Sequence, residues 1–284
     1  MRNFIISTER TCDLSTQVLA ENQIESIGMK FSINNVEYSD ENSLTGKEYC
    51  DFMREGAITS TSAVNPYDAK VFFTELLKQG KDILHIGFSS GLSSTFKNMQ
   101  SVAEELNATH ENKIYLVDTL SACSGQGLMC MLAVEKADQG KDIKEVYNYL
   151  ETIKNNVCAF FTVDHLKYLE RGGRISKATA IAGTLLQIKP VLHLNDEGAI
   201  VQYKKVTGRK KSIMTLCEEF VKRYTNVSSK IYIAHADSLE DAELLQSLIK
   251  RKSGLDSQIF ELSRVICSHS GPGTIALFFV GNER

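Results

Sequence analysis

The feature of this sequence that most constrains its fold is the alternation, over its first half, of short apolar runs with longer segments of helical pattern. Asn3–Ser7, Asp82–Phe88 and Ile114–Asp118 are short, mainly apolar runs, which predict buried strands. Segments of about 10–15 residues that show helix-start signals lie between these runs. Strands that alternate with helices favour a mostly parallel sheet with helices on both faces. We therefore expect an α/β fold for this part of the chain.

Turn and cap residues place several boundaries within this pattern. Phe31–Tyr38 alternates polar and apolar residues around two asparagines, which predicts a β-hairpin. Thr45 and Glu48 have the spacing of a capping box and open a helix. Asn65, which a proline follows, begins another helix that runs to about Gly80.

The second half of the chain has a different order of elements. We expect a strand at Val157–Thr162, a short helix that ends at Glu170, and a hairpin whose turn is Asp196-Glu197-Gly198. Further helices and strands are expected at Arg209–Tyr224, Lys230–His235, Ser238–Arg251 and Phe278–Val280. This mixture predicts a second domain of the α+β class. We place the N-terminal α/β domain at residues 1–160 and the smaller C-terminal domain at residues 161–284.

Composition excludes several classes of protein. The chain has 284 residues, of which 43% are hydrophobic and 24% charged, an ordinary globular balance. Its net charge of −3 argues against a nucleic-acid-binding protein. The apolar runs are too short for a signal peptide or a membrane span. Seven cysteines form no C-x-x-C pair or zinc-ligand cluster. We therefore expect reduced thiols, no metal site and a cytoplasmic location.

Hydroxyl-rich loops carry the functional signal. Ligands of a parallel sheet bind beyond the carboxyl ends of its strands, which Thr8–Asp13, Ser89–Thr95 and Asp118–Gly127 follow here. Ser89–Thr95 and Thr59–Ser62 precede expected helix starts, where hydroxyls and free N–H groups can hold an anion. On spacing alone, turn and cap residues are the simpler explanation. His269 stands out because a Gly-Pro-Gly turn follows it closely, although a lone histidine is more often structural.

Seven segments resemble those of one protein family, in the same order and along nearly the whole chain. They are Ile6–Leu14, Thr61-Ser62, Ser89–Phe96, Val117–Gly127, Leu169–Lys177, Ile188-Lys189-Pro190 and His269–Gly273. Together they resemble the DegV family, which includes the fatty-acid-binding subunit (FakB) of bacterial fatty acid kinase. Glu9-Arg10, Ala63-Val64-Asn65 and Thr207 depart from the family pattern. These departures bear on acyl selectivity and on the identity of the partner.

The resemblance implies both a fold and a function. The fold is an α/β N-terminal domain and a smaller α+β C-terminal domain, with a long-chain fatty acid between them. Thr61, Ser62, Ser93 and His269 stand where family members contact the carboxylate of the acid. In the family, a separate ATP-dependent kinase subunit phosphorylates that carboxylate to an acyl-phosphate. The chain itself would then carry no catalytic residue and need no cofactor.

One apolar stripe is a candidate wall for the acyl chain. It lies on a short expected helix and consists of Ile181, Ala182, Leu185 and Leu186. A long-chain fatty acid would suit such a stripe. Ordinary core packing explains the same pattern equally well.

Basic residues gather between Lys167 and Lys211, where ten lysines and arginines are opposed by three acidic residues. On a chain with a net charge of −3, this local excess indicates a face for an acidic kinase partner or for an anionic membrane surface. Arg171 and Arg174 are our candidates for contact with the kinase. A solvated face without any partner explains the same charges.

Other functions fit parts of the sequence. Serine-rich loops and a histidine suit a hydrolase, but no G-x-S-x-G elbow occurs. Gly208–Ser212 resembles the end of the phosphate loop of a small-molecule kinase, but the leading glycine is missing. A third possibility is a lipid-binding protein without a kinase partner. A co-purifying fatty acid would favour a carrier, whereas bound nucleotide would favour a kinase.

Overall fold

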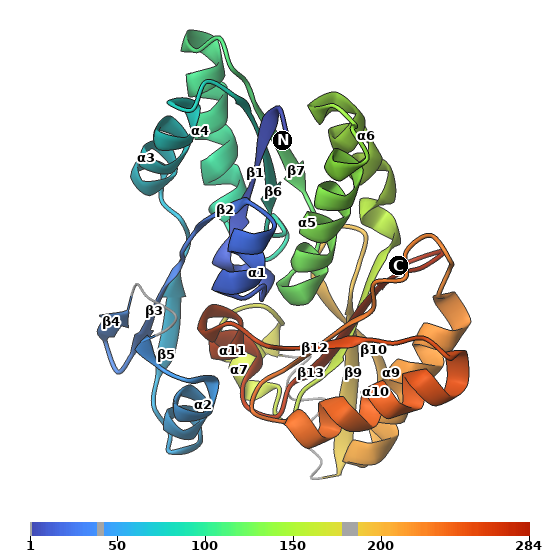
Figure 1. The fold of residues 1–284 in the computed structure, drawn as a ribbon. Helices are drawn as coiled ribbons and strands as arrows, with labels where there is room; N and C mark the ends of the chain where they lie inside the picture. Colours follow the sequence, from blue (N-terminus) through green and yellow to red (C-terminus); the bar gives the residue numbers. More distant parts are fainter. Residues whose placement is uncertain (1, 39–42, 178–186) are drawn as a thin grey trace.

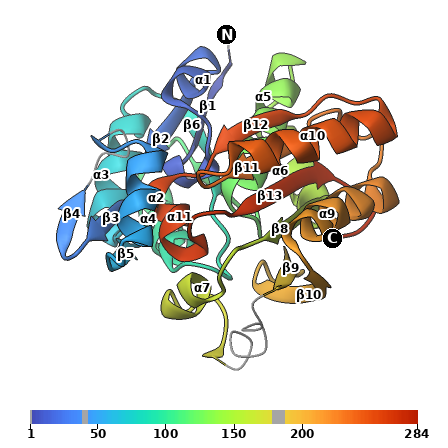
Figure 2. The same cartoon turned by 90° about the horizontal axis from the view of Figure 1, so that it is seen from below.

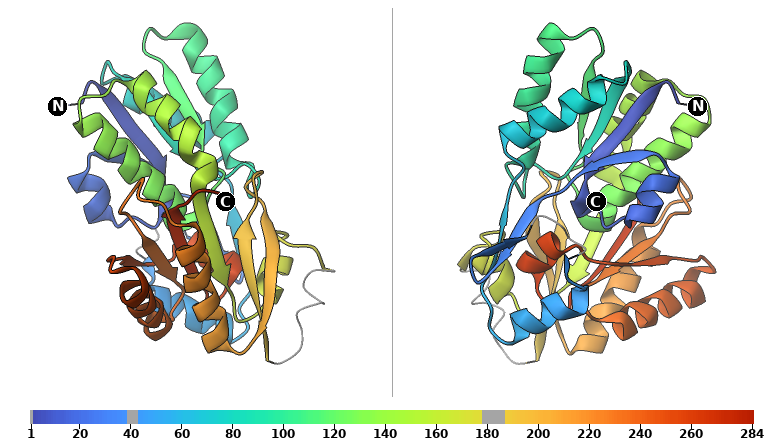
Figure 3. Two further views of the ribbon diagram at one scale, coloured as in Figure 1. Left: turned by 90° about the vertical axis from the view of Figure 1, so that its right-hand side faces the viewer. Right: turned by 60° about the vertical axis from the view of Figure 1, so that its left-hand side comes forward.

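The computed structural model describes residues 2–38, 43–177 and 187–284. A parallel sheet and a mixed sheet lie one above the other, and a small antiparallel sheet stands beside them (Figure 1). The two large sheets keep this arrangement in the rotated views (Figure 3). Among the described residues, the structure contains no helix that could span a membrane.

The first sheet confirms the expected α/β pattern. Its strands are all parallel and run in the order β2-β1-β6-β7. They are β1 (Phe4–Glu9), β2 (Ile24–Ile27), β6 (Asp82–Gly87) and β7 (Ile114–Asp118). Helices α3 and α4 cover one face, and α5 and α6 cover the other (Figure 1). Their bounds, with those of α1, are α1 (Thr16–Glu21), α3 (Pro66–Leu77), α4 (Thr95–Thr109), α5 (Cys123–Asp138) and α6 (Ile143–Ile153).

A small sheet and one helix branch from this layer. The sheet consists of β3 (Lys30–Ile33), β4 (Val36–Tyr38) and β5 (Thr59–Ser62), and α2 (Gly46–Arg54) follows β4 in the chain. The predicted hairpin is confirmed, since Asn34 and Asn35 have φ angles of 49° and 67°, as its tight turn requires. Both halves of the capping box of α2 are also present.

The hydroxyl run of residues 59–62 lies in front of α3, as expected, and itself forms strand β5. This strand pairs antiparallel with β3. Because alternate side chains of a strand point to opposite faces, β5 separates Thr61 from Ser62.

The second half of the chain forms a six-stranded mixed sheet in the order β10-β9-β8-β13-β11-β12. Its strands are β8 (Val157–Thr162), β9 (Ile188–Leu194), β10 (Ile200–Thr207), β11 (Tyr232–His235), β12 (Gln258–Glu261) and β13 (Ile275–Val280). Helices α9 (Arg209–Arg223) and α10 (Leu239–Ser253) lie side by side against it (Figure 2). The hairpin and the helices expected here are confirmed.

The sequence predicts a loop at His269, and this prediction is wrong. It lies in the last turn of α11 (Arg264–Ser270), a short helix that begins after the N-cap Ser263. The helix is only seven residues long, and Gly271 caps its C-terminus. The Gly-Pro-Gly segment that follows predicts a turn, so the short helix in front of it was not recognised. A second short helix, α7 (Lys167–Arg171), packs against α11.

Helix α5 joins the two large layers. It contacts β1 and β6 of the parallel sheet, and β8, β11 and β13 of the mixed sheet. Most of its residues are buried for this reason. The start of α5 therefore lies where the two halves of the molecule meet, and Ala122 and Cys123 there line a cavity.

Candidate functional site

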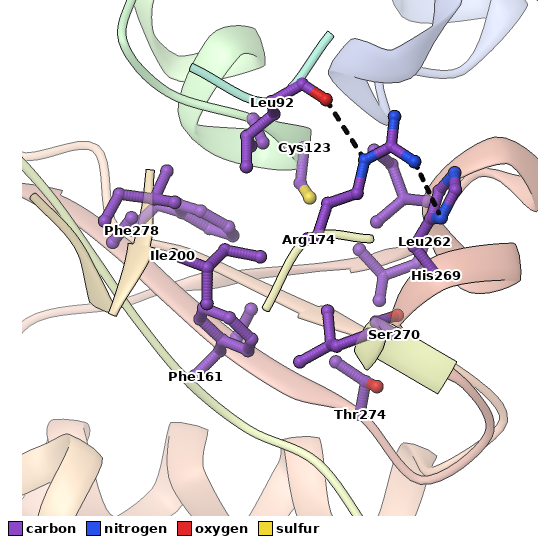
Figure 4. A pocket seen from close by; sticks show the side chains of 16 residues that line it. Leu92, Cys123, Phe161, Arg174, Ile200, Leu262, His269, Ser270, Thr274 and Phe278 are labelled. Atoms are coloured by element: carbon purple, nitrogen blue, oxygen red, sulfur yellow. Dashed lines mark hydrogen bonds between the residues drawn. The ribbon is translucent and has the colours of Figure 1, made fainter. Parts of the chain in front are cut away.

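An apolar cavity lies between the start of α5 and one face of the mixed sheet (Figure 4). The cavity and the solvent-filled space at its opening together hold about 570 Å³. Most of its wall is aliphatic or aromatic. The apolar residues that line it include Leu92, Ala122, Ala159, Phe161, Leu194, Ile200, Leu262, Ile266, Ala276 and Phe278.

Two cross-strand pairs shape the floor of this cavity. Ala159 of β8 pairs with Phe278 of β13, and Phe161 of β8 pairs with Ala276 of β13. Each pair sets a small side chain opposite a large ring on the same face of the sheet. The two alanines thus leave a trough between the two rings.

Polar groups cluster at one end of the cavity. Nε2 of His269 lies 2.8 Å from Oγ1 of Thr61, although 208 residues separate the two in the chain. Nη1 of Arg174 lies 3.5 Å from Nδ1 of His269. A guanidinium can only donate, so this contact makes Nδ1 the acceptor and leaves the ring proton on Nε2. Nε2–H then donates to Thr61, whose own hydroxyl hydrogen stays available for a ligand.

The imidazole of His269 is neutral in this site. Burial, and then the positive charges of Arg174 and Arg171, lower the pKa of His269 to about 4. Gly172 makes room for the ring, since a Cβ on that residue would lie 2.2 Å from Nδ1 of His269. Close packing against His269 thus explains the first glycine of the R-G-G-R segment, Gly172.

The other two expected carboxylate residues lie in different settings. Ser93 belongs to the turn between β6 and α4, and its Oγ donates to Oγ1 of Thr95 at 3.0 Å. Its neighbour Leu92 lines the cavity. Ser62 is exposed and, as the neighbour of Thr61 on β5, points to the opposite face. The structure therefore brings Thr61 and His269 together but does not place Ser62 beside them.

Arg174 and Arg171, which we expected to face a partner, differ in burial. Arg174 is half-buried and lines the cavity, and its Nε donates to the carbonyl oxygen of Leu92 at 3.1 Å (Figure 4). Arg171 is exposed, and its Nη2 donates to Oγ1 of Thr59 at 3.0 Å. Arg174 thus has a place inside the site that sequence spacing does not reveal.

Ser270 is a cavity residue that the sequence pattern did not indicate as part of the site. It lines the cavity and is buried, and in the described part of the chain its Oγ has no hydrogen-bond partner. Its place directly after His269 was the only available hint. The expected tail-lining stripe, Ile181, Ala182, Leu185 and Leu186, lies outside the described residues.

The segment Lys167–Lys211 has less net positive charge around it in the folded protein than its sequence suggests. Acidic residues from beyond this segment pair with several of its members. The pairs are Lys189–Asp164 at 2.9 Å, Lys204–Glu219 at 2.6 Å, Arg209–Asp241 at 2.8 Å and Lys211–Glu218 at 2.9 Å. Much of the local excess of charge is therefore balanced by tertiary contacts.

Fold and site together define an α/β protein with an internal apolar cavity and a hydroxyl–imidazole–guanidinium cluster at one end of it. A family model described as an uncharacterised protein of the DegV family matches residues 3–282. A DegV domain-containing protein of Clostridium perfringens is 41% identical, over 100% of this chain and 99% of that protein. The chain belongs to the DegV family, which confirms the resemblance seen in its motifs.

Solved structures agree with this assignment. A fatty-acid-binding DegV family protein from Thermus thermophilus is similar with a TM-score of 0.88 and 28% identity, over 99% of this chain and 100% of that one. DegV of Bacillus subtilis, a fatty acid binding protein, is similar with a TM-score of 0.85 and 25% identity, over the same shares of the two chains.

Proposed function

We propose that this protein binds a long-chain fatty acid and presents its carboxylate to a separate kinase subunit, which converts it to an acyl-phosphate. The observation that carries this proposal is the apolar cavity lined by His269, whose Nε2 lies 2.8 Å from Oγ1 of Thr61. The fatty acid binding of the Thermus and Bacillus proteins supports it. The acid would lie between the two domains, residues 1–160 and 161–284.

The tail supplies the affinity in this proposal. Burial of about 14 methylenes, at about 0.8 kcal/mol each, contributes roughly 11 kcal/mol before the costs of association. The trough beside Ala159 and Ala276 offers a surface for such a chain. No specific polar contact is needed along this part of the ligand.

The head requires the opposite solution, because a carboxylate without partners is strongly unfavourable away from water. Thr61, Ser93 and His269 are the proposed contacts, whereas Ser62, the fourth expected residue, points to the opposite face of β5. Hydroxyl donors to a charged acceptor contribute about 1.5–3 kcal/mol each. Of these three, Thr61 is best prepared, since His269 already donates to its oxygen and frees its hydrogen. The positive charge of Arg174 next to the ring favours an anion further.

The first experiment is mass spectrometry of the purified protein under denaturing conditions. A co-purifying fatty acid is the expected result, since a tightly held ligand survives purification. A bound nucleotide would instead favour a small-molecule kinase, which the basic segment after Gly208 left open. Absence of any acid, together with no binding of added palmitate, would overturn the proposal.

The second experiment separates binding from transfer. In the proposed reaction, His269 steadies the charge that develops as the carboxylate accepts a phosphoryl group. The variant His269→Ala should therefore abolish acyl-phosphate formation with a kinase subunit, while palmitate binding largely survives. Equal loss of binding and of turnover would contradict this division. A wild-type protein that binds palmitate but yields no acyl-phosphate with any such kinase would favour a lipid-binding protein without a kinase partner.

The cellular location follows the same proposal. All seven cysteines are free and buried. Free thiols are typical of a reducing compartment, and the proposed kinase and its ATP are cytoplasmic. We therefore place the protein in the cytoplasm, and a brief contact with an anionic membrane surface would allow it to collect its ligand.

A further inference from the structure

Ser89 organises the turn that carries Ser93. It is fully buried. Its carbonyl oxygen accepts the N–H groups of Leu92 at 3.1 Å and of Ser93 at 3.3 Å. Its Oγ accepts the N–H of Gly91 at 3.1 Å. Three consecutive backbone N–H groups of the turn are therefore held by one serine.

The same hydroxyl reaches the other half of the molecule. A hydroxyl has a single hydrogen to donate, and that of Ser89 goes to the carbonyl oxygen of Gly198 at 2.8 Å. Gly198 lies at the tip of the hairpin between β9 and β10 and has a φ of 70°. A Cβ at this position would lie 2.2 Å from Oγ of Ser89 and 2.9 Å from Cα of Leu120. Only glycine allows the hairpin to approach this closely.

This contact lies at the edge of the cavity. Leu92 lines the cavity from the Ser89 turn, and Leu194 and Ile200 line it from the two strands that flank the hairpin tip. Arg174 also donates to the carbonyl oxygen of Leu92. The turn that carries Ser93 is thus held on one side by its own sheet and on the other by the C-terminal half.

We propose that Ser89 and Gly198 are positioning residues, which act across the junction of the two halves to hold Ser93 in place for the ligand carboxylate. This inference rests on the proposed function. It assigns to the hairpin tip a task in recognition of the head of the ligand, although neither Ser89 nor Gly198 touches that head.

The test compares a ligand that has a carboxylate with one that lacks it. Dissociation constants for palmitate and for 1-hexadecanol, which has the same length but no charge, are measured for the wild type and for Ser89→Ala. The expected result is palmitate binding weakened about five- to tenfold, with hexadecanol binding unchanged. A merely structural role of Ser89 would weaken both ligands alike. Ser90→Ala is the matched control, since its contact in this turn is made by the backbone N–H.

Combination with Ser93→Ala shows through which residue Ser89 acts. In the Ser93→Ala background, Ser89→Ala should cause no further loss of palmitate. Gly198→Ala, which disturbs the same contact from the hairpin, should reproduce the selective loss and should not add to Ser89→Ala. An additive loss in the Ser93→Ala background, or parallel losses of both ligands, would overturn the inference. A wild type that fails to bind palmitate would instead overturn the proposed function.

Discussion

Two histidine clusters in the described part of the chain share a hydroxyl and an imidazole but differ in their charged group and in their setting. In the core of the parallel sheet, Nδ1 of His85 lies 3.0 Å from Oγ of Ser7, and its Nε2 lies 3.2 Å from Oε1 of Glu9. All three side chains are fully buried. At the cavity, His269 contacts a threonine hydroxyl and a guanidinium.

The comparison shows that the presence of suitable residue types is not sufficient for a functional site. Ser7, His85 and Glu9 are the residue types of a hydrolytic triad. Yet the Glu9 carboxylate is fully engaged, because it also accepts the Phe88 N–H at 3.0 Å and Nε2 of Gln126 at 2.6 Å. A network satisfied in this way specifies the packing of the core. The His269 cluster has a guanidinium in place of the carboxylate, and it adjoins an apolar cavity.

The largest effect is expected when the core cluster is broken. Glu9→Leu leaves Nε2 of His85 and the Phe88 N–H without their acceptor in the core and removes one of the acceptors of Gln126. It should cost about 3–5 kcal/mol of unfolding free energy. Chemical denaturation measures this loss. Palmitate affinity of the folded fraction should stay within about twofold. A stable variant, or one that folds but no longer binds palmitate, would mean that the core cluster is not purely structural.

A change at the cavity cluster should have a large effect on palmitate affinity and a small effect on the free energy of unfolding. Thr61→Val removes the hydroxyl but keeps the shape, so palmitate binding should weaken about 10–100-fold. Unfolding free energy should fall by only about 1 kcal/mol, because Thr61 is half-buried. Thr61→Ser is the matched control and should bind nearly as well as the wild type. Titration calorimetry decides, and equal affinities for all three proteins would contradict the proposed contact.

The pH dependence provides a finer comparison. The folded pKa of His269, about 4, lies below the ordinary value of about 6.5, so its stabilising contribution is complete above pH 6.5 and is lost as the pH falls through 4. Burial raises the pKa of Asp13 to about 7, so the contribution of that residue is instead lost as the pH rises through 7. The difference in unfolding free energy between the wild type and His269→Gln isolates the histidine.

Nuclear magnetic resonance offers a direct check. The ring signals of His269 should titrate near pH 4 in the free protein, and bound palmitate should move the midpoint upward, because a nearby anion favours the imidazolium. An unchanged midpoint would show that the carboxylate binds elsewhere.

The smallest effect is expected at the rim. Reversal of Arg171 and Arg174 to glutamate should slow transfer to the kinase, but Arg174 also contacts His269. Arg171→Glu alone is therefore the cleaner variant. It should reduce the rate of kinase coupling several-fold at low salt and leave palmitate affinity within about twofold. A coupling rate that does not change would remove Arg171 from the partner surface.

Local physics explains which elements could be predicted. The capping box of Thr45 and Glu48 and the turn at Asn34 and Asn35 lie within a few residues, so short-range geometry specifies them. Helix α11 and strand β5 were missed for the opposite reason. Each is short and is stabilised by distant partners, as when Oγ of Ser268 in α11 lies 2.5 Å from the Tyr49 hydroxyl. Propensity alone is a weak guide for such segments.

The amino-acid pattern was sufficient to predict the α/β alternation, the caps and turns, and the ordered motifs that mark the family. The tertiary structure alone decided that Thr61 meets His269, that Arg174 enters the site, and that Ser89 reaches Gly198 across the two halves. It also brought Asp164 and Glu219 to the segment Lys167–Lys211. The difference arises because these interactions act over different separations along the chain. Backbone hydrogen bonds and caps act between neighbours in the chain, whereas a binding site is made by packing, which joins residues without regard to their separation in sequence.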